Sequence, residues 1–225
     1  MNGSLVLRLV RRASPAPAPR PAMLPAPSEP SPGWAAVPGG GPSVAGEPVY
    51  WTLRPRLFAR PLEGAPSGPV ADGTGFGPGA SFHHDGAPGT ISARQCADPS
   101  APGGQALAIE MRGFAGRYFS LAAALPDKPP VALTRASILD AVAEIAADGP
   151  FEAVVRIHLD CGVNRERWMR PLLLSPKGLS ASFDLAFLPP PGPQGGWVDL
   201  IFGRVGCDRI RLLDFRLSHR LRADL

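Results

Sequence analysis

The C-terminal segment contains two apolar runs that favour β-structure, and they constrain the fold more than any other feature. Residues 196–202 and 209–217 are rich in β-branched and aromatic side chains, and a polar turn at Gly206-Cys207-Asp208 separates them. Two such runs joined by a short loop that contains glycine predict an antiparallel hairpin. Because an isolated hairpin is at best marginally stable in water, the preceding chain must supply more sheet.

The clearest strand in that preceding chain spans residues 151–160. Side chains alternate between the two faces of a strand. One face is apolar and carries Phe151, Ala153, Val155, Ile157 and Leu159. The other face is polar and carries Glu152, Arg156, His158 and Asp160. This pattern predicts a strand with one face on a core.

Residues 137–147 fit two different elements. Ile138, Ala141, Val142 and Ile145 have the spacing of a helix face, whereas Leu139, Ala141, Ala143 and Ile145 have the spacing of a strand face. We favour the strand, because the clearest strand follows directly after the turn Asp148-Gly149-Pro150. Further strands are expected at residues 90–95, 105–111, 117–125, 167–174 and 180–187.

About eight short strands with almost no helix predict a mainly β protein, an antiparallel β-sandwich of jelly-roll type. Its core is expected to contain apolar residues of every strand: Leu107, Ile109, Phe119, Leu121, Val155, Ile157, Phe183, Leu185, Val198, Leu200, Leu213 and Phe215. Phe187 is expected to point inward with Phe183 and Leu185.

Composition divides the chain into three parts. Residues 1–49 are dominated by Pro, Ala, Gly and Ser, and they predict a disordered, Pro-rich, basic arm. Residues 50–81 hold an aromatic cluster at 50–58, expected to lie as a strap across one sheet, and a linker rich in Gly and Pro. Residues 82–225 are expected to form the sandwich domain.

The formal net charge of +4 belongs to the N-terminal part. Residues 1–60 carry seven arginines against Glu29 and Glu47, so the remaining chain is close to neutral. A neutral domain argues against a nucleic-acid partner. No apolar run is long enough for a transmembrane segment. Three widely spaced cysteines and no signal-peptide pattern predict reduced thiols in a cytoplasmic protein.

The polar face of the strand at 151–160 is the candidate binding site. Arg156, His158 and Asp160 share that face, and Trp168 lies in the loop that follows as a candidate platform at the rim. Neighbouring strands would add Asp184 and Asp199. Carboxylates, a guanidinium and an indole together are typical of sugar-binding sandwiches. The alternative is an exposed sheet face whose alternating charges only keep it in solution.

The segment Phe82-His83-His84-Asp85 has the composition of a metal site. Adjacent histidines on an extended chain point to opposite sides, so we interpret the segment as a polar turn and predict no metal ligand there. No serine lies in a GxSxG motif, and no cysteine has a histidine placed to activate it. The glycines at 73–77 lack the flanking strand and helix of a phosphate-binding loop. No catalytic residue and no cofactor are predicted.

Several segments resemble an uncharacterised family of bacterial proteins with no assigned function. They are Trp51-x-Leu-Arg-Pro55, Phe82-His-His-Asp85, Arg156-Ile-His-Leu159 before Gly162-x-Asn164, Trp197-Val-Asp-Leu-Ile-Phe202, and the tail from Leu212 to Leu225. The strand at 209–217 is also similar to the closing strand of galactose-binding-like and carbohydrate-binding jelly-rolls. That second resemblance implies a fold and not a function.

The sequence therefore predicts a non-catalytic binding module with a glycan or protein ligand. A first alternative is a structural or assembly protein that engages a partner chain through its N-terminal arm. A second alternative is a metal- or carboxylate-dependent hydrolase.

Overall fold

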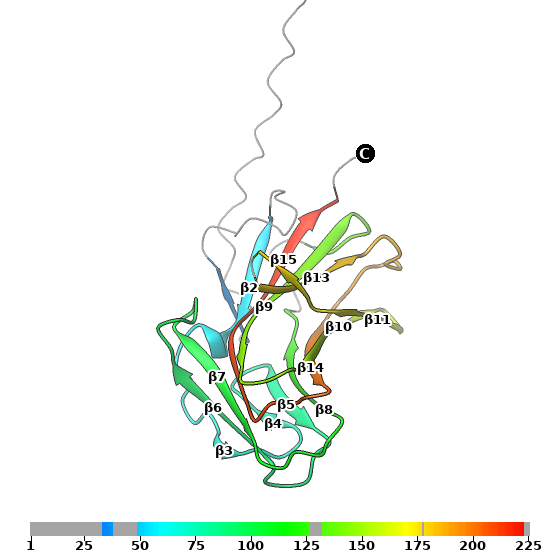
Figure 1. Ribbon diagram of the computed structural model, residues 1–225. Helices are drawn as coiled ribbons and strands as arrows, with labels where there is room; N and C mark the ends of the chain where they lie inside the picture. Colours follow the sequence, from blue (N-terminus) through cyan, green and yellow to red (C-terminus); the bar gives the residue numbers. More distant parts are fainter. Residues whose placement is uncertain (1–32, 38–48, 127–131, 177, 223–225) are drawn as a thin grey trace, which may run out of the picture.

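The computed structural model describes residues 33–37, 49–126, 132–176 and 178–222. Within these ranges the chain forms fifteen strands and one 3₁₀ helix, η1 (Arg56–Phe58). The strands make two sheets that share one core (Figure 1). Every described pairing of strands is antiparallel. The predicted antiparallel β-sandwich is confirmed, with more strands than the eight or so expected.

The larger sheet has nine strands and is built around β15. Its members are β1 (Trp34–Ala36), β2 (Trp51–Pro55), β3 (Ser67–Pro69), β6 (Ile91–Ala97), β7 (Gln105–Met111), β9 (Ser137–Ala147), β12 (Leu173–Ser175), β13 (Gly178–Asp184) and β15 (Arg209–Leu221). On one side β15 pairs with β9 over almost its whole length. On the other side it pairs first with β7, through residues 209–212, and then with β2, through residues 217–219 (Figure 1).

The smaller sheet has six strands. In spatial order they are β11 (Asn164–Pro171), β10 (Glu152–Cys161), β14 (Gly196–Gly203), β8 (Tyr118–Ala124), β5 (Ala80–His84) and β4 (Thr74–Gly75). The apolar face of β10 is buried as predicted, because Val155, Ile157 and Leu159 are each 0% exposed. Residues 137–147 form β9, which confirms the strand and rules out the helix.

The prediction that the last two strands form a C-terminal hairpin is wrong. β14 belongs to the six-stranded sheet and pairs with β10 and β8, whereas β15 belongs to the nine-stranded sheet. The chain therefore crosses from one layer to the other between residues 203 and 209. Both strands find their partners in earlier parts of the chain, and those long-range pairings replace the local one.

Two residues of the predicted core lie elsewhere. A bulge shifts the register between Leu212 and Asp214, so Leu212 is 0% exposed while Leu213 is only half-buried. The extra residue moves the alternation by one position. Phe187 is 89% exposed, because β13 ends at Asp184 and the alternation no longer holds beyond it.

The first described residues contribute two strands, β1 and β2, to the nine-stranded sheet. Residues 1–32 and 38–48, most of the predicted arm, lie outside the described residues. The aromatic cluster at 50–58 forms β2 and η1, and β2 pairs with β1 and β15. The domain boundary expected at residue 82 falls inside β5, so residues on both sides of it belong to one strand.

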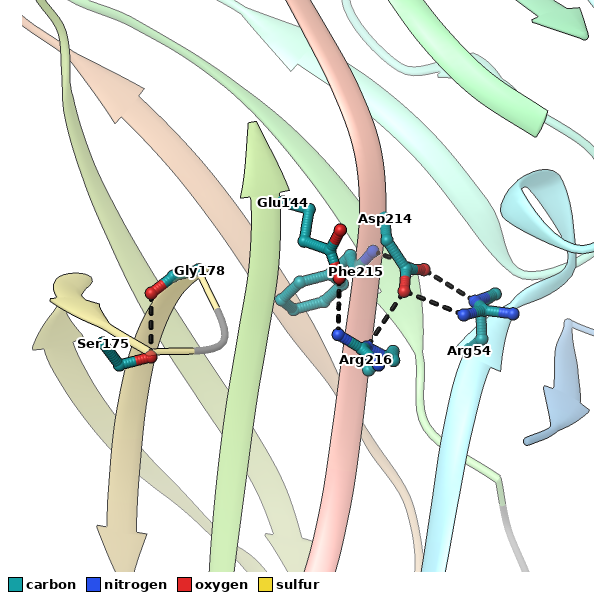
Figure 2. A network of polar contacts seen from close by, with 7 residues as sticks. All are labelled: Arg54, Glu144, Ser175, Gly178, Asp214, Phe215 and Arg216. Carbon is teal, nitrogen blue, oxygen red and sulfur yellow. Dashed lines mark hydrogen bonds and ion pairs between the residues drawn. The ribbon is translucent and has the colours of Figure 1, made fainter. Parts of the chain in front are cut away.

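A polar cluster occupies the point where β15 changes partner from β7 to β2. Asp214 is fully buried, and its carboxylate accepts hydrogen bonds from the Arg54 guanidinium at 2.6 and 2.9 Å. The Arg216 guanidinium lies 2.9 Å from the same carboxylate and also contacts Glu144 (Figure 2). The backbone N–H of Phe215 donates a further hydrogen bond to Asp214 at 3.0 Å. The Asp214 carboxylate finds its partners within the cluster, which is typical of a structural network, although Arg216 Nε makes an ion pair with it and no hydrogen bond.

Candidate functional site

The outer face of the six-stranded sheet brings polar side chains of β10 and β14 together. In the antiparallel register Arg156 lies opposite Asp199, and His158 lies opposite Trp197. Directly opposed residues share one face of the sheet. The alternation that buries Val155 and Ile157 therefore places these four side chains side by side on the other surface.

Arg156 and Asp199 form a fixed ion pair. Arg156 Nε donates to Asp199 Oδ2 at 2.8 Å, and a terminal guanidinium nitrogen lies 2.7 Å from the same oxygen. The indole N–H of Trp197 donates to that oxygen as well, at 3.3 Å. Asp199 is 3% exposed, whereas the Arg156 side chain is 35% exposed. The guanidinium is thus held in place with part of its surface still accessible.

The Trp197 indole is locked by its neighbours. Its ring stacks on that of His158 with centroids 4.1 Å apart and planes 15° apart, and the Arg165 guanidinium lies 4.6 Å from its centroid. Arg165 in turn donates to Asp160 at 2.6 Å. Gly196 has φ +147°, and a Cβ there would lie 2.0 Å from the His158 carbonyl oxygen. Only glycine allows β14 to approach β10 this closely just before Trp197.

His158 is a neutral imidazole with unused hydrogen-bonding capacity. It is 9% exposed, and burial lowers its pKa, with the positive charge of Arg156 acting in the same direction. Neither ring nitrogen makes a hydrogen bond within the described residues, and Nε2 lies 3.7 Å from Asp199 Oδ2. Buried polar atoms are nearly always paired with protein or water. Both ring nitrogens are buried, so this imidazole acts on the site by stacking on Trp197.

Two adjoining cavities are hollowed into this face. The larger has a volume of about 680 Å³, and its lining includes the charged side chains of Asp72, Arg156 and Asp199. The smaller has a volume of about 400 Å³. His83, Ala122 and Trp197 line both. Ala122 and Ala124 of β8 are small, so the sheet surface beside Trp197 is open to a ligand.

Four of the six residues predicted for the site lie on this face: Arg156, His158, Asp160 and Asp199. Trp168 lies opposite Ile157 and packs against the core, so it points away from the cavities. Asp184 belongs to β13 of the other sheet, where it pairs with Arg222. The alternation rule found the residues of β10 and β14, but it did not tell which sheet β13 would join.

Sequence reasoning missed the opposite wall of the cavities. Asp72, Ser81 and His83 line it together with β8. His83 faces the cavities, while the neighbouring His84 is buried and its Nε2 lies 3.1 Å from the Val70 carbonyl oxygen. The alternation of β5 predicts that Ser81 and His83 share a face. Nothing in the spacing points to Asp72, which reaches them from a turn.

The described residues contain no candidate metal centre. Within residues 33–37, 49–126, 132–176 and 178–222, no group of three or more His, Cys, Asp or Glu side chains is arranged to hold a metal ion. Cys96, Cys161 and Cys207 are free thiols.

Comparison with known sequences decides the family. Residues 41–225 match a family described as a family of unknown function (DUF6478). The chain belongs to this family. No curated protein matches the sequence.

Solved structures with a similar arrangement of strands include several carbohydrate-binding modules, all remote. A family 11 module from Clostridium thermocellum, solved with a β-1,3-1,4-mixed-linked tetrasaccharide, is 12% identical, with a TM-score of 0.36 over 72% of this chain and 100% of that one. The CBM22-1 xylan-binding domain of Paenibacillus barcinonensis Xyn10C is 10% identical, with a TM-score of 0.37 over 71% and 99%. The enzymatically active domain of tailspike protein 4 of bacteriophage CBA120 is 6% identical, with a TM-score of 0.42 over 64% and 19%.

No helix among the described residues of this family member has the length and apolar character needed to cross a membrane.

Proposed function

We propose that this DUF6478 chain is a glycan-binding module and that its ligand lies in the two cavities on the outer face of the six-stranded sheet. The observation that supports this most strongly is that Trp197, Arg156 and Asp199 together line a cavity of about 680 Å³. Sites for small ligands typically have volumes of about 300–1,000 Å³ and a few fixed polar groups.

The chemistry of the lining fits a sugar. A sugar presents hydroxyl groups, which donate and accept hydrogen bonds, and patches of C–H that contact aromatic rings. Asp199 and Asp72 accept hydrogen bonds, and Arg156 donates them. Trp197 contributes an indole whose orientation is fixed before any ligand arrives, so little entropy is lost on binding.

The same reasoning favours a glycan over a protein ligand. The cavities are concave, and the larger one places the carboxylates of Asp72 and Asp199 among apolar surface, whereas charged residues such as Asp are depleted in the core of a protein interface. The cytoplasmic location expected from the sequence remains part of the proposal, and it would make a cytoplasmic glycan or glycoconjugate the ligand.

A titration of two variants tests the proposal. We expect calorimetry with a panel of soluble oligosaccharides to give saturable binding to the wild-type chain. Trp197→Ala should raise Kd about thirtyfold, equivalent to about 2 kcal/mol, because a central aromatic contact is removed.

Phe187→Ala is the matched control, because Phe187 is 89% exposed and lies beyond the end of β13 in the other sheet. It removes an aromatic ring of similar size and should leave Kd unchanged. The proposal fails if no oligosaccharide binds the wild-type chain, or if a folded Trp197→Ala variant binds as tightly as the control.

A further inference from the structure

Three side chains at the wall of the cavities form a continuous hydrogen-bonded chain. Asp72 Oδ1 lies 3.1 Å from His83 Nδ1, and His83 Nε2 lies 2.9 Å from Ser81 Oγ. The backbone N–H of His84 donates to Asp72 Oδ1 at 3.2 Å, which fixes the carboxylate. The alternation of β5 directs Ser81 and His83 to the same side of the sheet.

The carboxylate determines which way the protons point. An ionised Asp72 only accepts hydrogen bonds, so Nδ1 of a neutral His83 carries the proton. Nε2 is then the nitrogen with a free lone pair, and the Ser81 hydroxyl donates to it. A serine that donates to a histidine held by a carboxylate is the arrangement that activates a hydroxyl nucleophile, and it is recognised by geometry rather than by order in the chain.

The two cavities meet at this group and differ in character. Ser81 and His83 line the smaller one, whose other walls are the small residues Gly79, Ala80, Ala122 and Ala124 with Trp197. The larger one extends from His83 toward polar side chains, among them Asp72 and Asp199. A substrate with a short apolar part and a polar part would therefore place its junction next to Ser81.

We propose that Ser81 is the nucleophile of an acyl-ester hydrolase, with His83 as general base and acid and Asp72 as the positioning residue. The acyl group lies in the smaller cavity and the alcohol part in the larger one. The identification of the alcohol as a sugar hydroxyl rests on the proposed glycan binding. The proposed reaction at Ser81 is independent of it.

The reaction proceeds in two balanced steps. Ser81 Oγ forms a bond to the acyl carbon as its proton passes to His83 Nε2, the bond from that carbon to the alcohol oxygen breaks, and the leaving alcohol takes the proton. A water molecule then attacks the acyl-serine as its proton passes to His83 Nε2, the bond to Oγ breaks, His83 returns the proton to Ser81 Oγ, and the carboxylic acid leaves. The sum is ester plus water to carboxylic acid plus alcohol. Solvent water reaches the site because the His83 side chain is 38% exposed.

The test uses the full chain and two probes that do not depend on the identity of a glycan. We expect a fluorophosphonate probe to form a covalent adduct that peptide mass spectrometry places on Ser81, and p-nitrophenyl acetate to be hydrolysed with turnover. Ser81→Ala and His83→Ala should each lower kcat by roughly 10²–10⁴-fold. The Ser81→Ala variant is the decisive one, because the imidazole of a histidine can attack an activated ester such as p-nitrophenyl acetate without any serine.

The test of Asp72 needs a measurement that a purely structural role of this residue would not alter, so kcat and KM are determined separately. Its side chain is 66% exposed, and water screens much of its charge. Asp72→Asn should therefore lower kcat less than His83→Ala does, with KM unchanged, and Asp72→Glu should restore part of the loss. Ser92→Ala, a serine of β6 in the other sheet, is the control and should keep full activity and full labelling.

The outcomes separate the two proposals. If the probe labels no residue, labels a serine other than Ser81, or labels the folded His83→Ala variant at the wild-type rate, the hydrolase is overturned. Binding of oligosaccharides measured by calorimetry would still stand in that case. If Ser81 is labelled while no oligosaccharide binds, the hydrolase survives and its alcohol is not a sugar.

Discussion

At the scale of the residue, His219 shows how the core controls the charge of a side chain. It is fully buried near the rings of Tyr50 and Trp51, with centroids 5.6 and 5.3 Å away, and its Nε2 lies 2.9 Å from Ser137 Oγ. Burial lowers its pKa from 6.5 to about 4. The native state therefore holds this imidazole neutral over a range in which an unfolded chain protonates it.

This difference predicts that the free energy of unfolding falls as the pH falls from about 6.5 to about 4. Within that window the unfolded chain binds more protons than the native protein, so acid favours unfolding. The contribution is about 3 kcal/mol between pH 7 and pH 4. Urea unfolding at several pH values should show it.

His219→Gln is the comparison for that measurement, because glutamine keeps a hydrogen-bonding side chain that does not titrate. Carboxylates titrate in both proteins and cancel in the difference. Equal pH dependence of wild type and variant between pH 4 and 6.5 would show that His219 is not held neutral by burial.

Residues on regular strands could be predicted from the sequence, and residues at irregular positions could not. Alternation along residues 151–160 placed Arg156 and His158 on the outer face as the structure has them. Leu213 was misplaced because a bulge inserts one residue before Asp214. Asp72 was missed because a turn, and no period of the sequence, brings it to His83.

At the scale of the element, β15 depends on the charges at its bulge. Between its pairing with β7 and its pairing with β2 the strand has a stretch of backbone without a neighbour on that side. Asp214 fills this position and receives the guanidinium groups of Arg54 and Arg216. Both Asp214 and Arg54 are buried, at 0% and 9% exposure.

Asp214→Asn should therefore lower the free energy of unfolding by about 3–5 kcal/mol, because it leaves the buried Arg54 without its counter-charge. Urea unfolding followed by tryptophan fluorescence measures the loss. Glu152→Gln is the control, since Glu152 is 62% exposed and pairs with an 84% exposed Arg204 at 3.3 Å. We expect it to cost at most about 1 kcal/mol. A cost for Asp214→Asn no larger than that of the control would contradict the structural role.

The predicted hairpin of the last two strands was wrong because local composition does not determine which strands pair. Gly196–Gly203 and Arg209–Leu221 have the composition of a hairpin, and a local pairing is the simplest inference from it. The same composition is found here in two strands that belong to different sheets. What separates the alternatives is the pairing with β8, β9 and β10, and such long-range partners have no signature in a short stretch of sequence.

At the scale of the whole molecule, the two outer faces have different characters. The nine-stranded sheet carries a cavity of about 480 Å³ lined by residues of β6, β7, β9 and β15, together with charges that pair with one another around the almost completely buried carboxylates of Asp214 and Asp140. The six-stranded sheet carries two adjoining cavities with Trp197 in the lining of both and the accessible part of Arg156 in the larger one. The central claim is that ligands bind to the second face.

An NMR titration of the isotopically labelled chain with a panel of oligosaccharides tests this claim most directly, because it reports binding and its location together. We predict that amide and indole signals of Ser81, His83, Ala122, Arg156 and Trp197 shift and saturate with one Kd, while signals of β6, β7 and β13 stay in place. Shifts concentrated on the nine-stranded sheet, or no shift with any member of the panel, would contradict the claim.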